Sequence, residues 1–141
     1  MTRHDYETGP LRLVLVDDHE FARAAVATSL AAQPGLEVVG EAGSVAVARA
    51  LVELVEPDVA ILDLNLPDGN GGELLDWYSK ERPELRCVIF TSAVTEREKE
   101  RLLSKGADAV ILKTLRGSDL VDAIRQVRPS NDDAGANLPN A

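Results

Sequence analysis

Three carboxylates stand where apolar segments of this chain end. Asp63 directly follows the apolar residues 59–62, and Asp17 and Asp18 follow the largely apolar residues 11–16. A carboxylate in such a place has to be hydrated, paired or bound to a metal ion, because burying an isolated charge is costly. Carboxylates that are brought together repel one another unless a cation joins them. Hard oxygen ligands of this kind suit Mg²⁺.

Thr91 and Lys113 follow two further apolar segments in the same way. A lysine supplies a compact positive charge, and a threonine hydroxyl supplies a rotatable hydrogen bond. Asp63 could act as the nucleophile, while a metal ion and Lys113 neutralise phosphoryl oxygens and Thr91 binds one of them. The set is therefore suited to phosphoryl transfer.

The segments that carry these residues are expected to be strands. Short apolar runs with many β-branched residues predict five of them, at residues 11–16, 36–42, 59–63, 87–90 and 110–112. A helical pattern follows each strand after a short connection, which predicts an α/β fold with a doubly wound, five-stranded parallel sheet. The carboxyl ends of parallel strands meet at one edge of a sheet, so the polar residues are expected to converge there.

Several residues are predicted to have structural roles. Ser44, Thr95 and Ser118 are candidate caps of the helices that follow them, and residues 66–72 are expected to form a glycine-rich loop. The first helix, at residues 20–32, is expected to bury a face made by Phe21, Ala24, Ala25, Thr28 and the Leu30-Ala31 pair. Cys87 is interpreted as a small buried hydrophobe, Trp77 and Tyr78 as packing residues, and His19 as a surface residue at a helix start rather than a metal ligand.

The composition is that of one globular domain. The chain has 141 residues, of which 45% are hydrophobic and 28% charged, and a net charge of −9. This negative charge argues against a nucleic-acid surface on this chain. No secretory signal and no apolar run of the roughly 20 residues needed to cross a membrane are present, so we expect a cytoplasmic protein. Residues 1–10 are expected to be a flexible leader, 11–128 the folded domain, and 129–141 a flexible tail or linker.

Five short motifs lie at the ends of predicted strands or beside them. They are Val-Asp-Asp-His at 16–19, Leu-Asp-Leu-Asn-Leu-Pro-Asp-Gly at 62–69, Phe-Thr-Ser at 90–92, Lys-Gly-Ala-Asp at 105–108 and Leu-Lys at 112–113. Together they resemble the receiver domain of two-component response regulators. The resemblance covers residues 11–128 and implies the flavodoxin-like (βα)5 receiver fold. The first two motifs look most like those of the LuxR-type DNA-binding subgroup.

The resemblance implies a role for each matching residue. Asp63 would accept a phosphoryl group from a phosphohistidine on a sensor histidine kinase. Mg²⁺ would be held by Asp17, Asp18, Asp63 and the backbone carbonyl of Asn65. Thr91 and Lys113 would contact the phosphoryl oxygens. Asn65, Ser92 and Ala93 would stand at positions that tune the rate of dephosphorylation. Apart from slow autodephosphorylation the chain would not be an enzyme. Phosphorylation would switch its surface, with a homodimer as one outcome.

The chain departs from the family pattern at two positions. Val110 stands where the family has Tyr or Phe, three residues before the lysine, so the usual aromatic switch coupled to Thr91 is missing. Thr114 stands where a cis proline often follows the lysine, and a cis bond is costly without proline. The LuxR-type subgroup often lacks that proline too.

Two other kinds of function share part of this residue pattern. A haloacid-dehalogenase-like phosphatase also uses Asp, Mg²⁺, Thr or Ser and Lys, but there a second acid stands two residues after the nucleophile, where this chain has Asn65. A receiver-like interaction module that works without phosphorylation is supported only by Val110. The domain could stand alone, or it could precede a DNA-binding domain that regulates transcription and is not in this chain. In either case this chain is not expected to contact nucleic acid or a membrane.

Overall fold

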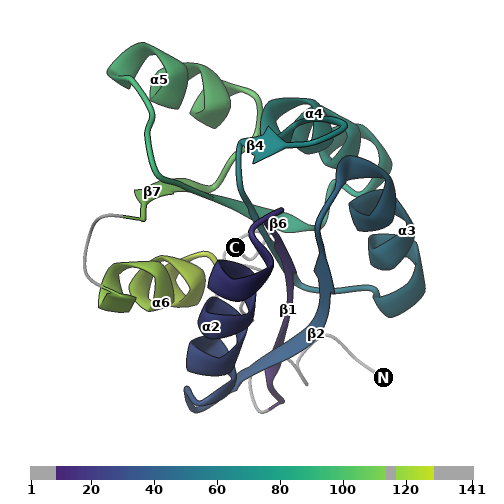
Figure 1. The fold of residues 1–141 in the computed structure, drawn as a ribbon, viewed down its shortest axis with the longest axis vertical. Helices are drawn as coiled ribbons and strands as arrows, with labels where there is room; N and C mark the ends of the chain where they lie inside the picture. The colour runs from purple at the N-terminus through teal and green to yellow at the C-terminus, as the bar shows by residue number, and fades with distance from the viewer. Residues whose placement is uncertain (1–8, 114–116, 129–141) are drawn as a thin grey trace, which may run out of the picture.

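The computed structural model describes residues 9–113 and 117–128, and these residues form the expected α/β fold (Figure 1). Five parallel strands make one sheet in the order β2-β1-β3-β6-β7. The chain thus starts near the middle of the sheet and adds strands first on one side and then on the other. The strands are β1 (Leu11–Val16), β2 (Leu36–Ala42), β3 (Val59–Leu62), β6 (Arg86–Thr91) and β7 (Ala109–Leu112).

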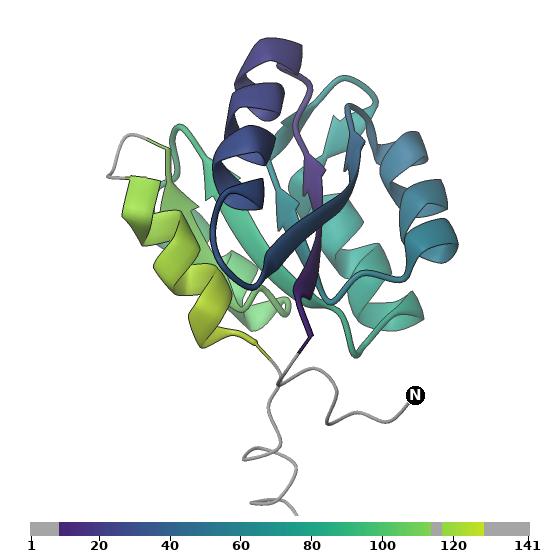
Figure 2. The same cartoon turned by 90° about the horizontal axis from the view of Figure 1, so that it is seen from below.

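Helices cover both faces of this sheet, as Figure 2 shows from below. Two helices, α2 (Glu20–Ala31) and α6 (Gly117–Gln126), lie on one face. The other face is covered by α3 (Val45–Val55), α4 (Gly71–Glu81) and α5 (Glu96–Ser104). None of the helices in these described ranges is both long and apolar enough to cross a membrane.

Alternate side chains of β1 point to opposite faces of the sheet, and each set contributes to the hydrophobic core on its own face. Leu11, Leu13 and Leu15 point to the face of α2 and α6, whereas Val14 and Val16 point to the face of α3, α4 and α5. Strand β3 is buried on both faces, as a central strand of a parallel sheet should be. Both faces of the middle strands are therefore dry, and polar side chains are excluded until the strands end.

The buried face of α2 differs from the expected one. Phe21 is 91% exposed, and Ala24, Ala25 and Thr28 are exposed as well. The residues that α2 buries are Ala27 and Leu30, and of these only Leu30 belongs to the expected face. Alanines lie on several sides of this helix, so its apolar pattern gave the wrong phase, and the sheet instead selects the side with the larger leucine.

The loop expected at residues 66–72 is partly regular. It contains a two-stranded antiparallel hairpin of β4 (Asn65–Leu66) and β5 (Gly69–Asn70), and α4 begins directly after it at Gly71. Asn70 is the N-cap of α4, because its side chain accepts a hydrogen bond from the backbone N–H of Glu73 (2.9 Å). The connection from β3 to α4 is thus short and tightly held.

The expected caps are confirmed at two of three helices. Ser44 accepts from the N–H of Val47, and Thr95 forms a capping box with Glu98. Ser118 is not a cap, because α6 already includes Gly117. The buried Cys87 thiol and the fully buried Tyr78, whose hydroxyl donates to the carbonyl of Ala48 (3.1 Å), confirm the packing roles expected for both.

Candidate functional site

The ends of four strands bring the predicted site residues to one edge of the sheet. The hydrogen bonding of the parallel sheet continues one residue beyond the strands. The backbone N–H of Asp63 donates to the backbone carbonyl of Val16 (2.9 Å), and that of Lys113 donates to the backbone carbonyl of Thr91 (2.8 Å). Asp17 N–H donates in the same way to the carbonyl of Ala42 (3.0 Å). The backbone of each residue is therefore fixed by the sheet itself, which is why its position could be predicted from where the strands end.

Lys113 lies between two of the carboxylates. Its ammonium is 2.5 Å from Oδ2 of Asp17 and 3.0 Å from Oδ2 of Asp63. Both carboxylate side chains are only 6% exposed, while that of Lys113 is 22% exposed. Two buried negative charges thus share one positive charge, and the carboxylate–lysine contact joins strands that are far apart in the chain.

These contacts shift the pKa of both partners toward the charged forms. Burial raises the pKa of Asp17, but hydrogen bonds from the Lys113 ammonium and the His19 backbone N–H outweigh it, and the net pKa is lowered. Burial likewise lowers the pKa of Lys113, but its hydrogen bonds to Asp17 and Asp63 outweigh that effect and raise it. At neutral pH the site holds a charged lysine beside a charged Asp17.

The backbone at the carboxyl end of β1 is held by a side chain from α2. The guanidinium of Arg23, on α2, donates to the carbonyl of Asp17 (2.7 Å) and to Glu41 (3.0 Å). Asp18 is more open, with a side chain that is 37% exposed. His19 is exposed at the start of α2, as expected, but its Nδ1 lies 3.2 Å from Asp18 and 3.4 Å from Asp17. That approach was missed because side-chain direction at a helix start is not visible in the sequence.

Thr91 and Asn65 flank Asp63 in different ways. Thr91 is fully buried, and its hydroxyl donates to the carbonyl of Ala93 (3.4 Å). The backbone N–H of Asn65 lies 3.4 Å from Oδ1 of Asp63, so its peptide group is beside that carboxylate. The role of its carbonyl as a metal ligand stays a prediction.

The connection after Asp63 contains a contact that the sequence analysis missed. Asp68 reaches across to the start of α3, where its two carboxylate oxygens accept from the backbone N–H groups of Val45 (2.7 Å) and Ala46 (3.0 Å). These hydrogen bonds, the Val45 bond first, lower the pKa of Asp68. Asp68 lies in the expected glycine-rich loop, and nothing in the local sequence indicates a partner more than 20 residues earlier in the chain.

Gly71 shows how closely this connection packs on the backbone of Asp63. A Cβ built at Gly71 would collide with the backbone carbonyl oxygen of Asp63, and would lie 3.0 Å from the Cα of Leu64. The N–H of Gly71 also donates to the carbonyl of Leu64 (2.9 Å). The start of α4 thus touches the peptide group of Asp63, and the absence of a side chain at Gly71 makes that approach possible.

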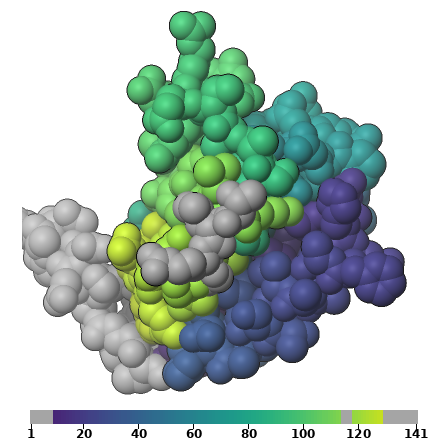
Figure 3. All heavy atoms as spheres, turned by 60° about the vertical axis from the view of Figure 1, so that its left-hand side comes forward, coloured from purple at the N-terminus to yellow at the C-terminus, as the bar shows by residue number. Residues whose placement is uncertain are grey.

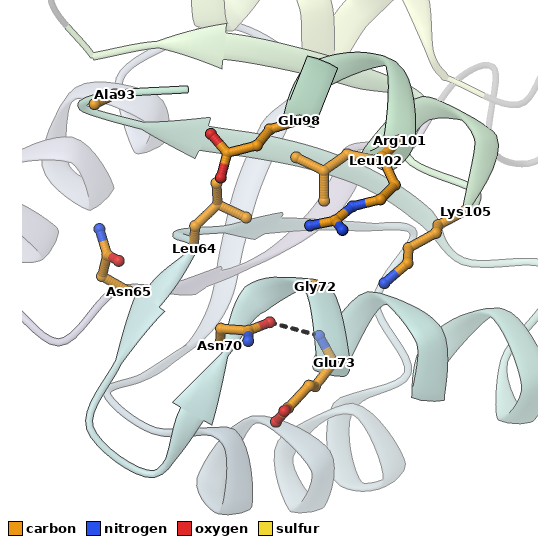
Figure 4. Close-up of a pocket in the computed structure, with 10 residues that line it drawn as sticks. All are labelled: Leu64, Asn65, Asn70, Gly72, Glu73, Ala93, Glu98, Arg101, Leu102 and Lys105. Carbon is orange, nitrogen blue, oxygen red and sulfur yellow. Dashed lines mark hydrogen bonds between the residues drawn. The ribbon is translucent and has the colours of Figure 1, made fainter. Parts of the chain in front are cut away.

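Beside this connection, a groove of about 420 Å³ lies between α5 and the start of α4 (Figure 4). Asn65 and Ala93 are among the residues that line it. Its walls carry charges of both signs, from Glu73, Arg101 and Lys105 among others. This mixture favours no single class of small ligand.

The donor set fits a hard divalent cation. Carboxylate oxygens of Asp17, Asp18 and Asp63, together with a nitrogen of His19, all lie within 4.8 Å of one another. Three carboxylates with only one ammonium among them leave negative charge to be neutralised, and oxygen-rich sites of this kind suit Mg²⁺. Val110, in contrast, is a half-buried residue packed against the core on the α3–α5 face. The position of the usual aromatic is filled by a small aliphatic side chain.

Comparison with known proteins agrees with this geometry. Residues 13–125 match the family described as the response regulator receiver domain. The chain is 44% identical over 117 residues to the DNA-binding transcriptional activator DevR/DosR of Mycobacterium tuberculosis, covering 83% of this chain and 54% of that protein. It is 35% identical over 116 residues to the response regulator protein VraR of Staphylococcus epidermidis, covering 82% and 56%. The chain therefore spans about half the length of the curated relatives it matches.

Solved structures show the same fold. A LuxR-family two-component response regulator from Aurantimonas sp. SI85-9A1 superposes with a TM-score of 0.81 at 28% identity, covering 84% of this chain and 85% of that one. The signal receiver domain of the putative response regulator NarL from Mycobacterium tuberculosis gives 0.78 at 27% identity, covering 84% and 95%. The chain belongs to the response regulator receiver domain family, and its receiver is of the LuxR type.

Proposed function

We propose that this chain is a phosphorylation switch in which Asp63 accepts a phosphoryl group from a phosphohistidine of a sensor histidine kinase. The observation that carries the proposal is the position of Asp63. It is a buried carboxylate at the end of the central strand, 3.0 Å from the Lys113 ammonium and with Thr91 at the end of the next strand. A nucleophile held beside a fixed positive charge is the arrangement that phosphoryl transfer needs.

In the proposed reaction a carboxylate oxygen of Asp63 forms a bond to phosphorus as the phosphorus–nitrogen bond to the donor imidazole breaks. The imidazole leaves and an acyl phosphate remains on Asp63. The ammonium of Lys113, now shared between Asp17 and Asp63, is within reach of the new phosphoryl oxygens. The Thr91 hydroxyl would exchange its hydrogen bond to Ala93 for one to the phosphoryl group.

Asp17, Asp18, Asp63 and the backbone carbonyl of Asn65 would hold Mg²⁺. The bound ion would supply positive charge that neutralises the phosphoryl oxygens during transfer. The protein's own part is to hold the carboxylates in place before the ion arrives: Lys113 binds those of Asp17 and Asp63, and Arg23 fixes the backbone carbonyl of Asp17.

The phosphoryl group would be lost slowly by hydrolysis, with no separate substrate. Asn65 and Ala93 line the groove between α5 and the start of α4, and with Ser92 they are the positions from which water access to the acyl phosphate would be tuned.

The output is proposed to be transcription, through a DNA-binding domain outside this chain. DevR/DosR is a DNA-binding transcriptional activator, and this chain matches about half of it. The receiver would comprise residues 11–128 and work in the cytoplasm with its kinase. The expected leader at 1–10 and tail at 129–141 lie almost wholly outside the described residues, as does Thr114.

A phosphorylation-independent interaction module is the second candidate, and Val110 is the observation in its favour. Without an aromatic side chain at this position, Thr91 has no large partner on β7 whose rotation could report phosphorylation.

Intact-mass spectrometry separates the two candidates. After incubation with acetyl phosphate and Mg²⁺, the wild type should gain one phosphoryl group and Asp63→Asn should gain none, because the amide is not a nucleophile for phosphorus. Asp76→Asn is the matched control, since Asp76 is an exposed carboxylate on α4, and it should be labelled like the wild type. Labelling of Asp63→Asn would place the acceptor elsewhere, and no labelling of any protein would favour the interaction module.

A further inference from the structure

The N-terminus of α3 is closed by two side chains from different parts of the chain. Ser44 is the N-cap and accepts from Val47 (3.2 Å), which leaves the N–H groups of the first two helical residues without a partner in the helix. Asp68 accepts from both of these groups, at Val45 and Ala46. A carboxylate at a helix N-terminus also interacts favourably with the helix dipole. The pair of hydrogen bonds is therefore directional and charge-assisted.

Asp68 lies in the connection between β3 and α4, which also contains Asp63 and Asn65. This connection is held to itself at its two ends, where Asn65 N–H approaches Asp63 and Gly71 N–H donates to Leu64. Asp68 is the point at which it is hydrogen bonded to α3 instead. Leu66 of this connection is buried in the core, and Asp68 adds a hydrogen-bonded anchor on α3 through an exposed side chain.

The connection cannot shift without affecting the acceptor. Gly71 is packed so closely on the carbonyl of Asp63 that not even a Cβ fits between them. Asn65, three residues before Asp68, has its peptide group beside the Asp63 carboxylate. A displacement at Asp68 would therefore be passed to the backbone that surrounds Asp63.

We propose that Asp68 is a positioning residue, which fixes the connection after β3 on the N-terminus of α3 and thereby holds the Asn65 backbone where it can bind the divalent cation beside Asp63. This inference rests on the proposed function, because it concerns the affinity of the proposed metal site. Asp68 does not touch the ion. It acts on the ion through the backbone of Asn65.

Mg²⁺ binding measured by calorimetry on the whole chain tests the inference, with no phosphodonor present. Asp68→Ala should weaken Mg²⁺ binding by about tenfold, as is typical when a residue that orients a metal ligand is lost. Asp68→Asn keeps one acceptor oxygen and should lie between Asp68→Ala and the wild type. Affinities refer to folded protein, verified by circular dichroism at the same temperature.

Ser44→Ala is the matched control. It removes the other cap of the same helix without touching the connection after β3, so it should destabilise α3 and leave the Mg²⁺ affinity within about twofold of the wild type. Equal weakening by Ser44→Ala and Asp68→Ala would overturn the inference, since the effect would then come from α3 stability alone. Unchanged affinity in Asp68→Ala would overturn it as well. Absence of Mg²⁺ binding by the wild type would instead contradict the proposed metal site on which the inference depends.

Discussion

Lys113 balances the charge of the site in the absence of a metal ion. Its ammonium contacts two carboxylates whose side chains are almost fully buried. Breaking such a contact leaves a buried charge without a partner, and that costs more than the contact itself contributes. The same residue would also neutralise phosphoryl oxygens, so its structural and functional roles use one charge.

We expect Lys113→Ala to lower the free energy of unfolding by about 1.5–3 kcal/mol without Mg²⁺, the range for hydrogen bonds to charged groups. Saturating Mg²⁺ should stabilise this variant more than it stabilises the wild type, because the ion then replaces the missing charge. Urea denaturation with and without Mg²⁺ measures both effects. The variant should still accept a phosphoryl group, since Asp63 is intact, but should signal poorly.

Lys105→Ala is the control for this experiment. Lys105 pairs with Asp76 at 3.3 Å, but both side chains are well exposed, and surface pairs contribute about 0–1 kcal/mol. A loss in Lys113→Ala no larger than that in Lys105→Ala would contradict the charge-balancing role.

The site residues that could be predicted are those whose position depends only on where strands end. Asp17, Asp63 and Lys113 follow strands directly, and Thr91 is the last residue of β6, so the topology alone brings them together. Asp68 could not be predicted, because its function depends on a helix terminus that is near it only in the folded chain.

At the scale of elements, the connection from β3 to α4 and the start of α3 behave as one unit. Asp68 contributes to the N-terminus of α3, and Tyr78 of α4 donates to the carbonyl of Ala48 in the same helix. Helix α3 is therefore hydrogen bonded to the connection before α4 at its N-terminus, and to α4 itself through Tyr78.

The stabilising effect of Asp68 should depend on pH. Its pKa is lower in the folded protein than the value of about 3.9 expected when unfolded, so its contribution is fully present well above that value. It is lost as the pH falls below about 4, through the folded pKa, because the protonated acid no longer binds as an anion. The difference in unfolding free energy between wild type and Asp68→Ala should be constant from pH 7 to about 5 and shrink at lower pH.

Asp68→Asn provides the comparison, because neither amide nor alanine titrates at this position. Its difference from Asp68→Ala should stay constant over the same pH range. A wild-type difference that also stays constant down to pH 3 would show that the carboxylate charge does not contribute to this contact.

The elements themselves were largely predictable, and the exceptions have physical causes. Strands β1 and β2 begin and end where the apolar runs predict, and Thr95 caps α5 as expected. The hairpin at Asn65–Asn70 was not predicted, because two-residue strands are too short to show a periodic pattern. Leu30 of the predicted α2 face is buried as expected, but Phe21, Ala24, Ala25 and Thr28 are exposed, because small residues on all sides of a helix carry little information on which side is buried.

At the scale of the whole molecule, α5 and α6 both contact β7, and Figure 3 shows these segments in green and yellow on one side of the molecule. The homodimer expected from the family resemblance would form through α5, β7 and α6. Val110 lies on β7 and is half-buried, and Phe90 on the adjacent β6 is half-buried as well. Thr91 is the last residue of β6, which pairs directly with β7, so a change in the conformation of Thr91 would occur next to this surface.

We expect beryllofluoride with Mg²⁺, which mimics the phosphoryl group, to shift this 15.2 kDa chain toward a dimer in sedimentation velocity. Asp63→Asn should remain monomeric under the same conditions, because the mimic needs the carboxylate. A wild type that binds the mimic and stays monomeric at all concentrations tested would contradict dimerisation by this chain.

The contact between Lys113 and Asp17 spans 96 positions of the chain. The ribosome makes the acidic residues first and the lysine last, and β7, which carries Lys113 to the sheet, is an outer strand. A nascent chain therefore presents its acceptor long before it has the charge that completes the site. A polypeptide interrupted before residue 113 would contain Asp17 and Asp63 but not the ammonium that lies between them, so this arrangement of charges forms only after β7 has been synthesised.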